Sequence, residues 1–416
     1  MKNQRNTVAT TFIIFAAGLA ALILLTWANY QFSKQNPGGN DFLVHWVGTR
    51  SLVLEGQNPY SDEVALKIQT MAYGRAAQPG EHELRVAYPL YSVVVFLPFA
   101  LVGDFTLARA MWMTVLEVGL VALAFLSLRL ARWRISAPML VLLLLFSLLW
   151  YHGLRPLING NAVILVAVGV AAGILALRAG ADELAGVLFA FTTIKPQVVI
   201  LLLAFVVFWA ASRGRWRVIS WMVGTVILLA ASAALLIPDW MIHNLREVIA
   251  YPAYNPPGTP RAAFMEWWPA WGSRVGWVLT GLMAILLIVE WLANRGRDFN
   301  SFLWGACLTL TVAQWIGIQT DPGNFIVLFP AIVLVFSLLA DRWKTYGRVF
   351  VILSMLVLFA GIWAIFLSTI DRSGGQPVQS AVMFFPLPAY LLLTLYWVRW
   401  WAIQPPTVWF DQLDGR

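Results

Sequence analysis

VATTFIIFAAGLAALILLTWANY, residues 8–30, is an apolar run long enough to cross a bilayer, because a spanning helix needs about 20 apolar residues. The basic segment MKNQRN precedes it, and no small-x-small cleavage site follows it. The run also exceeds the roughly 7–15 residues of a signal-peptide core. We therefore predict a retained first transmembrane helix whose N-terminus lies in the cytoplasm.

The composition of the whole chain leads to the same class. Of its 416 residues 60% are hydrophobic and 12% are charged, whereas soluble domains have about 45–50% apolar and about 25% charged residues. This predicts an all-α polytopic membrane protein. The net charge of +8 does not indicate nucleic-acid binding, because basic residues of membrane proteins collect in cytoplasmic loops. Cys307 is the single cysteine, which excludes an intrachain disulfide and a cysteine-ligated metal.

Apolar runs separated by Gly and Pro predict about twelve transmembrane helices. They cover roughly residues 8–30, 105–130, 137–152, 159–178, 184–194, 197–212, 217–237, 275–293, 300–318, 325–340, 348–370 and 382–400. The apolar segment 88–102 is short and contains Pro98, so we predict a re-entrant or interfacial helix there. With that choice every dense arginine cluster becomes cytoplasmic, as the positive-inside rule requires.

Two long loops then face outward, at about residues 31–104 and 238–274. We expect interfacial helices in both, since residues 42–53 have helical periodicity and EWWPAWG, residues 266–272, is aromatic and broken by proline. Residues 1–370 are predicted to form the transmembrane core. Residues 371–416 would contain the last loop, a final transmembrane helix and a cytoplasmic tail.

Polar residues that are costly in a membrane protein are predicted to lie at one depth, the external rim. They come from distant parts of the chain: Asp41, His45, Tyr88, Arg155, Asn161, Lys195, Asp321 and Asn324. Because the topology places their turns on the same side of the membrane, we expect them to form one site. No residue is predicted to be a metal ligand.

Lys195 lies in the turn TTIKPQ between two short apolar segments. Such a turn is expected to lie below the membrane surface, where an ammonium group is costly unless it is paired. A phosphate is a suitable partner for a partly desolvated point charge. The alternative is a lysine that snorkels to the interface.

Asp41 has two interpretations that do not exclude each other. As a general base it would take a proton from a hydroxyl group, and as an N-cap it would begin the helix that follows it. His45, one turn later, is either its hydrogen-bonding partner or an interfacial residue.

Arg155 either binds an anion or faces lipid head groups. Glu117, inside an apolar run, is a functional candidate by its position or makes a hydrogen bond to a neighbouring helix.

Several short motifs occur in a characteristic order. An outward loop with an early Asp41 and the turn GQNPY is followed by Tyr88-Pro89, a helix that ends in arginines, Gly160-Asn161 and AGVLFAFTTIKP. Together they resemble the GT-C superfamily of integral-membrane glycosyltransferases, and in particular glycosyltransferase family 87, the polyprenyl-phosphate-mannose-dependent mannosyltransferases. The resemblance covers about residues 8–370. The chain departs from the family in having Leu90 after Tyr88-Pro89, where Y-P-P is common, and Asn161 where glutamine is common.

The resemblance implies a GT-C fold and an inverting transfer of a hexose, mannose above all, from a polyprenyl-phosphate donor to a hydroxyl group of a glycolipid or glycan. Asp41 would be the catalytic base, Lys195 would hold the phosphate, and the loop with Asp321 and Asn324 would line the sugar pocket. We expect no cofactor, with a divalent cation left open, and a monomer in the cell membrane. Its site would be extracytoplasmic and both termini cytoplasmic. The alternatives are a ligase or polymerase of the O-antigen-ligase type and a lipid or sugar transporter.

Overall fold

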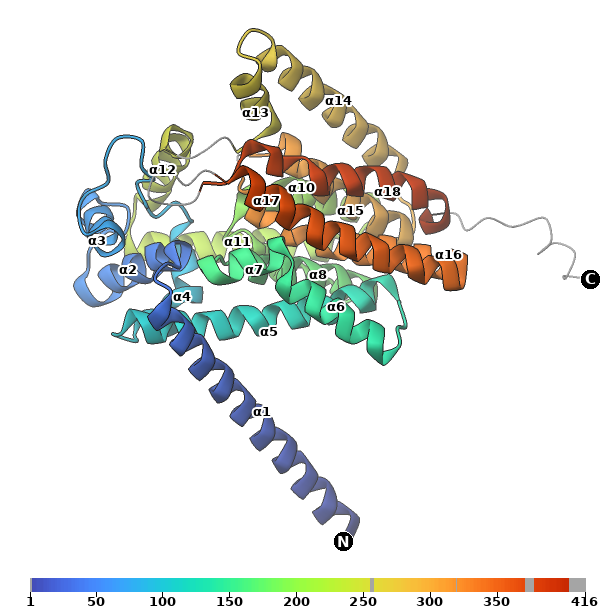
Figure 1. The fold of residues 1–416 in the computed structure, drawn as a ribbon, viewed down its shortest axis with the longest axis horizontal. Coiled ribbons are helices and arrows are strands. Elements are labelled where there is room, and N and C mark those ends of the chain that lie inside the picture. The colour runs from blue at the N-terminus through green and yellow to red at the C-terminus, as the bar shows by residue number, and fades with distance from the viewer. Residues whose placement is uncertain (1, 255–257, 319, 371–377, 404–416) are drawn as a thin grey trace, which may run out of the picture.

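The computed structural model describes residues 2–254, 258–318, 320–370 and 378–403, and these residues form helices and no β-strand (Figure 1). The helices are α1 (Lys2–Gln35), α2 (Asn40–Glu55), α3 (Asp62–Tyr73), η1 (Leu90–Ser92), α4 (Val93–Ala100), α5 (Phe105–Ala131), α6 (Ala137–Leu149), α7 (Tyr151–Asn159), α8 (Val163–Ala179), α9 (Asp182–Thr192), α10 (Pro196–Ser212), α11 (Trp216–Leu236), α12 (Trp240–Tyr254), α13 (Pro260–Trp267), α14 (Gly272–Ala293), α15 (Phe299–Ile316), η2 (Pro322–Leu328), α16 (Phe329–Leu356), η3 (Val357–Gly361), α17 (Ile362–Thr369), η4 (Ala381–Phe384) and α18 (Pro386–Ile403). The prediction of an all-helical protein is confirmed.

Within the described ranges, six helices are long and apolar enough to cross a membrane, or seven if α6 and α7, which are bent by 49°, count as one span. The six are Ile13–Gln35, Phe105–Ala131, Trp216–Leu236, Gly272–Ala293, Pro322–Thr369 and Ala381–Ile403. Helices α8 and α10 are apolar but shorter. These apolar helices support the prediction of a membrane protein, and the count of about twelve spans stays a prediction. The predicted cytoplasmic tail after Ile403 and residues 371–377 of the last loop lie outside the described residues.

The segment Pro322–Thr369 is not one straight helix. Lys344 has φ 48° and ψ −111°, which interrupts α16 near its middle. A Cβ atom on Gly347 would lie 2.2 Å from the carbonyl oxygen of Leu339, so the chain comes close to itself at this kink. The two separate helices predicted at 325–340 and 348–370 correspond to the two sides of the kink.

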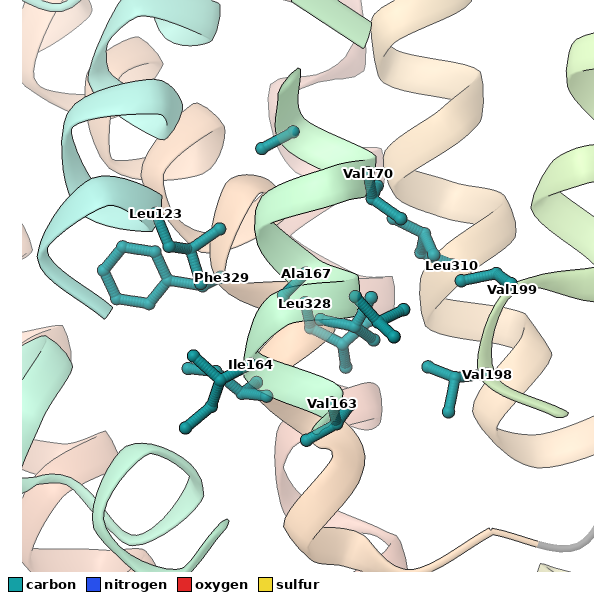
Figure 2. Packing of buried hydrophobic residues seen from close by; sticks show 14 of the residues in the cluster. Leu123, Val163, Ile164, Ala167, Val170, Val198, Val199, Leu310, Leu328 and Phe329 are labelled. Atoms are coloured by element: carbon teal, nitrogen blue, oxygen red, sulfur yellow. The ribbon is translucent and has the colours of Figure 1, made fainter. Parts of the chain in front are cut away.

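Helix α8 occupies the centre of the bundle (Figure 2). Its side chains Val163, Ile164, Ala167 and Val170 are fully buried. Around them lie Leu123 of α5, Val198 and Val199 of α10, Leu310 of α15, and Leu328 and Phe329 at the junction of η2 and α16. A helix that is apolar all round is expected in such a position. This packing around α8 determines where the ends of α7, α8 and α10 come together.

The segments predicted to lie outside the spans are helical but differ in burial from the expectation. Residues 88–102 contain the short helices η1 and α4, which do not reach spanning length, and a re-entrant or interfacial position of this segment stays a prediction. Helix α2 was expected to be amphipathic, yet residues 42–49 are all buried. It packs against α3, α4 and α5. The second loop contains α12 and α13.

The two ends of the bundle differ in charge. At one end arginines from several helices meet: Arg178 donates to the carbonyl oxygen of Arg129 at 2.8 Å, and Arg213 donates to that of Gly296 at 3.1 Å. Arg215 at this end is paired with Asp182. Asn161, in the turn between α7 and α8, and Lys195, in the turn between α9 and α10, lie at the other ends of α8, α9 and α10. Asp41, in the first turn of α2, bonds to Asn161 there.

Candidate active site

Asp41 lies in the first turn of α2, close to the end of α7. Gly39, with φ 79°, is the N-cap residue of this helix and makes no side-chain capping bond, so the interpretation of Asp41 as the N-cap is wrong. The buried Arg109 of α5 joins the two elements, because its guanidinium donates to the carbonyl oxygens of Asn36 at 2.7 Å and Ile158 at 3.2 Å. A Cβ atom on Gly39 would lie 2.5 Å from Arg109 Nε, so this close approach requires glycine.

The carboxylate of Asp41 is held by two amides from the turn between α7 and α8. Its Oδ2 accepts hydrogen bonds from Asn159 Nδ2 at 3.0 Å and from Asn161 Nδ2 at 2.9 Å. Asp41 is partly exposed, whereas Asn161 is 6% exposed. The carboxylate therefore keeps a fixed orientation and remains accessible from outside the protein.

Gly160 sets the direction of these two amides. It has φ 73°, a conformation that favours glycine, and its carbonyl oxygen accepts a hydrogen bond from Trp112 Nε1 at 2.8 Å. A Cβ atom on Gly160 would lie 2.5 Å from Cβ of Phe42. The turn thus needs glycine both for its backbone angle and for its contact with α2.

Replacing Gly160 with alanine is expected to destabilise the protein by about 2–4 kcal/mol, because left-handed strain and overpacking against Phe42 add together. Gly180→Ala is the matched control, since Gly180 has φ 75° and a Cβ atom added to it would meet no other atom within 4 Å. It should show the strain without the overpacking. Thermal unfolding of the purified proteins in detergent measures the difference, and equal midpoints for the two variants would contradict the contact with Phe42.

Lys195 lies between α9 and α10, and its side chain is 4% exposed. Its ammonium group donates to Asn161 Oδ1 at 2.7 Å and lies 5.3 Å from the ring centre of Tyr88. Among the described residues it makes no ion pair. Burial lowers the pKa of Lys195 to about 8, although the carboxylates of Asp41 and Asp321 act in the opposite direction. The sequence-based expectation of a turn that buries this lysine agrees with the structure.

Asn161 connects Asp41 to Lys195. A lysine can only donate and a carboxylate can only accept, so the amide orientation is fixed: Oδ1 faces Lys195 and Nδ2 faces Asp41. Oδ1 also accepts from the backbone N–H of Val163 at 2.9 Å. One side chain therefore places a partly exposed carboxylate and a buried ammonium next to each other.

Arg155 and Asp321 are paired with each other. The two terminal nitrogens of Arg155, Nη1 and Nη2, donate to the two carboxylate oxygens of Asp321. Gln379 Nε2 donates to the same carboxylate. Burial alone would raise the pKa of Asp321, but the Arg155 charge and the N–H of Gly323 hold it below its usual value. The guanidinium of Arg155 is thus already paired with a carboxylate of the protein. Arg155 therefore neither faces lipid head groups nor offers a free anion-binding site.

The remaining predicted residues lie in the same region. Asn324 is 2% exposed, accepts weakly from Asn161 Nδ2 at 3.4 Å and donates to Thr320 Oγ1 at 2.9 Å. The ring of His45 packs 4.0 Å from that of Tyr88 and 4.5 Å from that of Phe96, measured between ring centres. Burial and the charge of Lys195 lower the pKa of His45 to about 3, so it is neutral at neutral pH. Burial and Asp41 raise the pKa of Tyr88.

Sequence reasoning missed several residues of this region. His82 lies in the loop after α3. Burial lowers its pKa overall, while the nearby carboxylates of Asp41 and Asp321 act in the opposite direction. Its ring contacts that of Tyr251 in α12, with ring centres 5.8 Å apart. His152 bonds the carbonyl oxygen of Pro322 at 2.7 Å. No local pattern points to His82 or Gln379, whereas His152 lies in the same stretch as Arg155 and Asn161.

Glu117 does not belong to this site. It accepts a hydrogen bond from Asn29 Nδ2 of α1 at 2.8 Å, and Thr26 and Thr114 bond one turn away at 3.0 Å. This agrees with the alternative of a hydrogen bond to a neighbouring helix. Across the described ranges, no group of three or more His, Cys, Asp or Glu side chains is arranged to hold a metal ion.

Comparison with known proteins gives one match. Residues 87–253 match the family model described as Glycosyltransferase family 87. This stretch includes Tyr88, Arg155, Asn161 and Lys195, and it ends in α12. No curated protein and no solved structure matches the chain.

Proposed function

Because the chain is related to glycosyltransferase family 87 and is thereby a glycosyltransferase of the membrane type, we propose that it transfers a hexose, mannose above all, from a polyprenyl-phosphate donor to a hydroxyl acceptor. The observation that supports this most directly is the Asn161 amide, which joins the Asp41 carboxylate to the Lys195 ammonium. A transfer from a lipid phosphate needs a base and a cation near each other.

Lys195 is proposed to hold the phosphate of the donor. Its ammonium group has three N–H donors, and the described residues provide one hydrogen-bond acceptor for them. A buried ammonium without an ion pair is costly, and a phosphate would compensate this cost. Arg155 is a weaker candidate, because Asp321 already neutralises it.

Asp41 is proposed to be the base. The acceptor oxygen would attack the anomeric carbon from the face opposite the phosphate, and its proton would pass to a carboxylate oxygen of Asp41. The bond between the anomeric carbon and the phosphate oxygen would break with its electron pair, which leaves polyprenyl phosphate and an inverted glycoside. Lys195 would stabilise the charge that develops on the leaving phosphate.

The other predicted residues are proposed to shape the sugar pocket. His45 is neutral and packed against Tyr88, so these two rings are proposed to form one wall. Asn324 is proposed to bond the sugar, and Asp321 to hold the loop through its pair with Arg155. His82 joins them as a candidate for the acceptor side.

The experiment that tests this function is incubation of the purified protein with a panel of polyprenyl-phosphate sugars and glycolipid acceptors. The expected product is an inverted glycoside together with free polyprenyl phosphate. Turnover only with diphosphate-linked oligosaccharides would instead indicate a ligase or polymerase, and uptake without bond cleavage would indicate a transporter.

The site is proposed to face the extracytoplasmic side, with the arginine-rich end and both termini in the cytoplasm. Support comes from the positive-inside rule applied to the gathered arginines. Cysteine labelling with a membrane-impermeant reagent on intact cells should modify Gln78→Cys, in the loop after α3, and spare Arg134→Cys, after α5. Both positions are exposed, and the native Cys307 is buried and gives no background. The reverse labelling pattern would overturn this orientation.

A further inference from the structure

A cavity lies at the end of the bundle opposite Lys195. It is lined by Asn294, Arg297, Ser301, Arg399 and Trp400, and its volume is about 150 Å³. The volume that one water takes up in the liquid is about 30 Å³, so this space can hold a larger polar group. It is separated from Lys195 by the length of α10, whose last turn packs near Gly296 through Ser212.

The ends of the candidate spans place the cavity near the predicted boundary between membrane and water. Two candidate spans end beside it, α14 at Ala293 and α18 at Ile403, and α15 begins there. Trp397 and Trp400 are exposed on α18 at this level, as expected for an aromatic belt. Lipid phosphate groups lie at this depth.

Some polar atoms of the residues that line the cavity have no hydrogen-bond partner among the described residues. Arg399 is bound to Glu290 at 3.0 Å through one terminal nitrogen, but its buried Nε has no hydrogen-bond partner among the described residues. The same holds for Oδ1 of Asn294, a side chain that is 2% exposed. Arg297 is exposed and makes no ion pair with any described residue. Arg297 therefore offers exposed N–H donors at the cavity, and Arg399 Nε and Asn294 Oδ1 are unpaired polar atoms buried in its wall.

The local charges favour a zwitterionic ligand. Glu290 compensates Arg399, and Asp298, whose carboxylate accepts from Ser301 Oγ at 2.6 Å, directly follows Arg297 in the chain. A free phosphate would bring excess negative charge near these two acids. A head group that carries both a phosphate and an ammonium group fits the donors and the acceptor without this excess.

We propose that this cavity binds the head group of a phospholipid that has a hydrogen-bond donor, such as phosphatidylethanolamine. Its phosphate lies against Arg297 and Arg399, and its ammonium group donates to Asn294 Oδ1. Binding in this way requires a small shift of the Arg399 and Asn294 side chains, because the two unpaired atoms are buried. The site is separate from the proposed sugar transfer and does not rest on it.

Native mass spectrometry of the delipidated full-length protein tests the proposal. Phosphatidylethanolamine should bind with a stoichiometry of one, and more tightly than phosphatidylcholine, whose ammonium group has no N–H. Arg297→Gln should reduce this binding about tenfold, because a charge-assisted hydrogen bond is lost. Arg295→Gln is the matched control, since Arg295 is also exposed and does not line the cavity.

Three results would overturn the proposal: equal binding of the two lipids, equal losses in the two arginine variants, or full occupancy by inorganic phosphate alone. Thermal unfolding, followed with a thiol-reactive dye that reports exposure of the buried Cys307, gives a second readout. Phosphatidylethanolamine should raise the unfolding midpoint of the unmodified protein and of Arg295→Gln more than that of Arg297→Gln. Similar midpoint increases in all three proteins would count equally against the site.

Discussion

Replacing Asp41 with asparagine is expected to lower sugar transfer by about 10²- to 10⁴-fold, the contribution of a general base. Asparagine has the same shape, and its carbonyl oxygen can still accept from Asn159 or Asn161, so the turn between α7 and α8 should keep its structure. The loss should therefore appear in kcat with little change in the binding of the donor. Transfer rates at saturating donor and acceptor measure it.

Asp104→Asn is the matched control. Asp104 lies at the same end of the molecule as Asp41. It is the N-cap of α5, and its side chain accepts a hydrogen bond from the N–H of Leu107 at 2.7 Å. Asparagine is an equally good N-cap, so this variant should transfer sugar at the normal rate. If Asp41→Asn also retained normal turnover, Asp41 would not be the base.

Replacing Lys195 with alanine is expected to weaken donor binding by about 10- to 100-fold, because a charge-assisted hydrogen bond to phosphate is worth about 1.5–3 kcal/mol. The fold should tolerate the change, since Asn161 Oδ1 keeps its bond from the N–H of Val163. Affinity for polyprenyl phosphate, measured by titration, should fall far more than affinity for the acceptor. Lys34→Ala removes an exposed lysine at the end of α1 and should leave both affinities unchanged.

The protonation of Lys195 gives the same contact a pH signature. Burial lowers its pKa to about 8, so the charged form decreases as the pH rises above this value. Donor affinity of the unmodified protein is expected to fall by up to tenfold per pH unit there. Arginine remains charged throughout this range, and Lys195→Arg should therefore bind the donor with little pH dependence. Equal pH profiles of the two proteins would contradict a phosphate held by this ammonium group.

The sequence was sufficient to predict that distant polar residues would share one end of the bundle. Asp41, Asn161, Lys195 and Asn324 each follow or precede an apolar run, and counting those runs places their turns on one side. The contacts between them could not be obtained in this way. The pairing of Arg155 with Asp321 depends on how α7 packs against η2, and Gln379 comes from a segment without a distinctive pattern.

Helix burial was also difficult to infer from periodicity. Residues 42–53 have the spacing of an amphipathic helix, but α2 is covered on all sides along residues 42–49, because α3, α4 and α5 enclose it. Arg109 was overlooked for a related reason. It lies inside an apolar run, and its role in joining the first loop to α7 depends on carbonyl groups that no side-chain pattern reveals.

The arginines gathered at one end have a consequence for the energised membrane. A resting potential does electrical work of about 2.3 kcal/mol per elementary charge per 100 mV on a group carried across the bilayer. With that end in the cytoplasm, as proposed, turning the folded molecule over would carry every unpaired cation of that end against the voltage at once. In the proposed orientation the assembled bundle as a whole would therefore resist inversion, long after insertion of the first helix has ended.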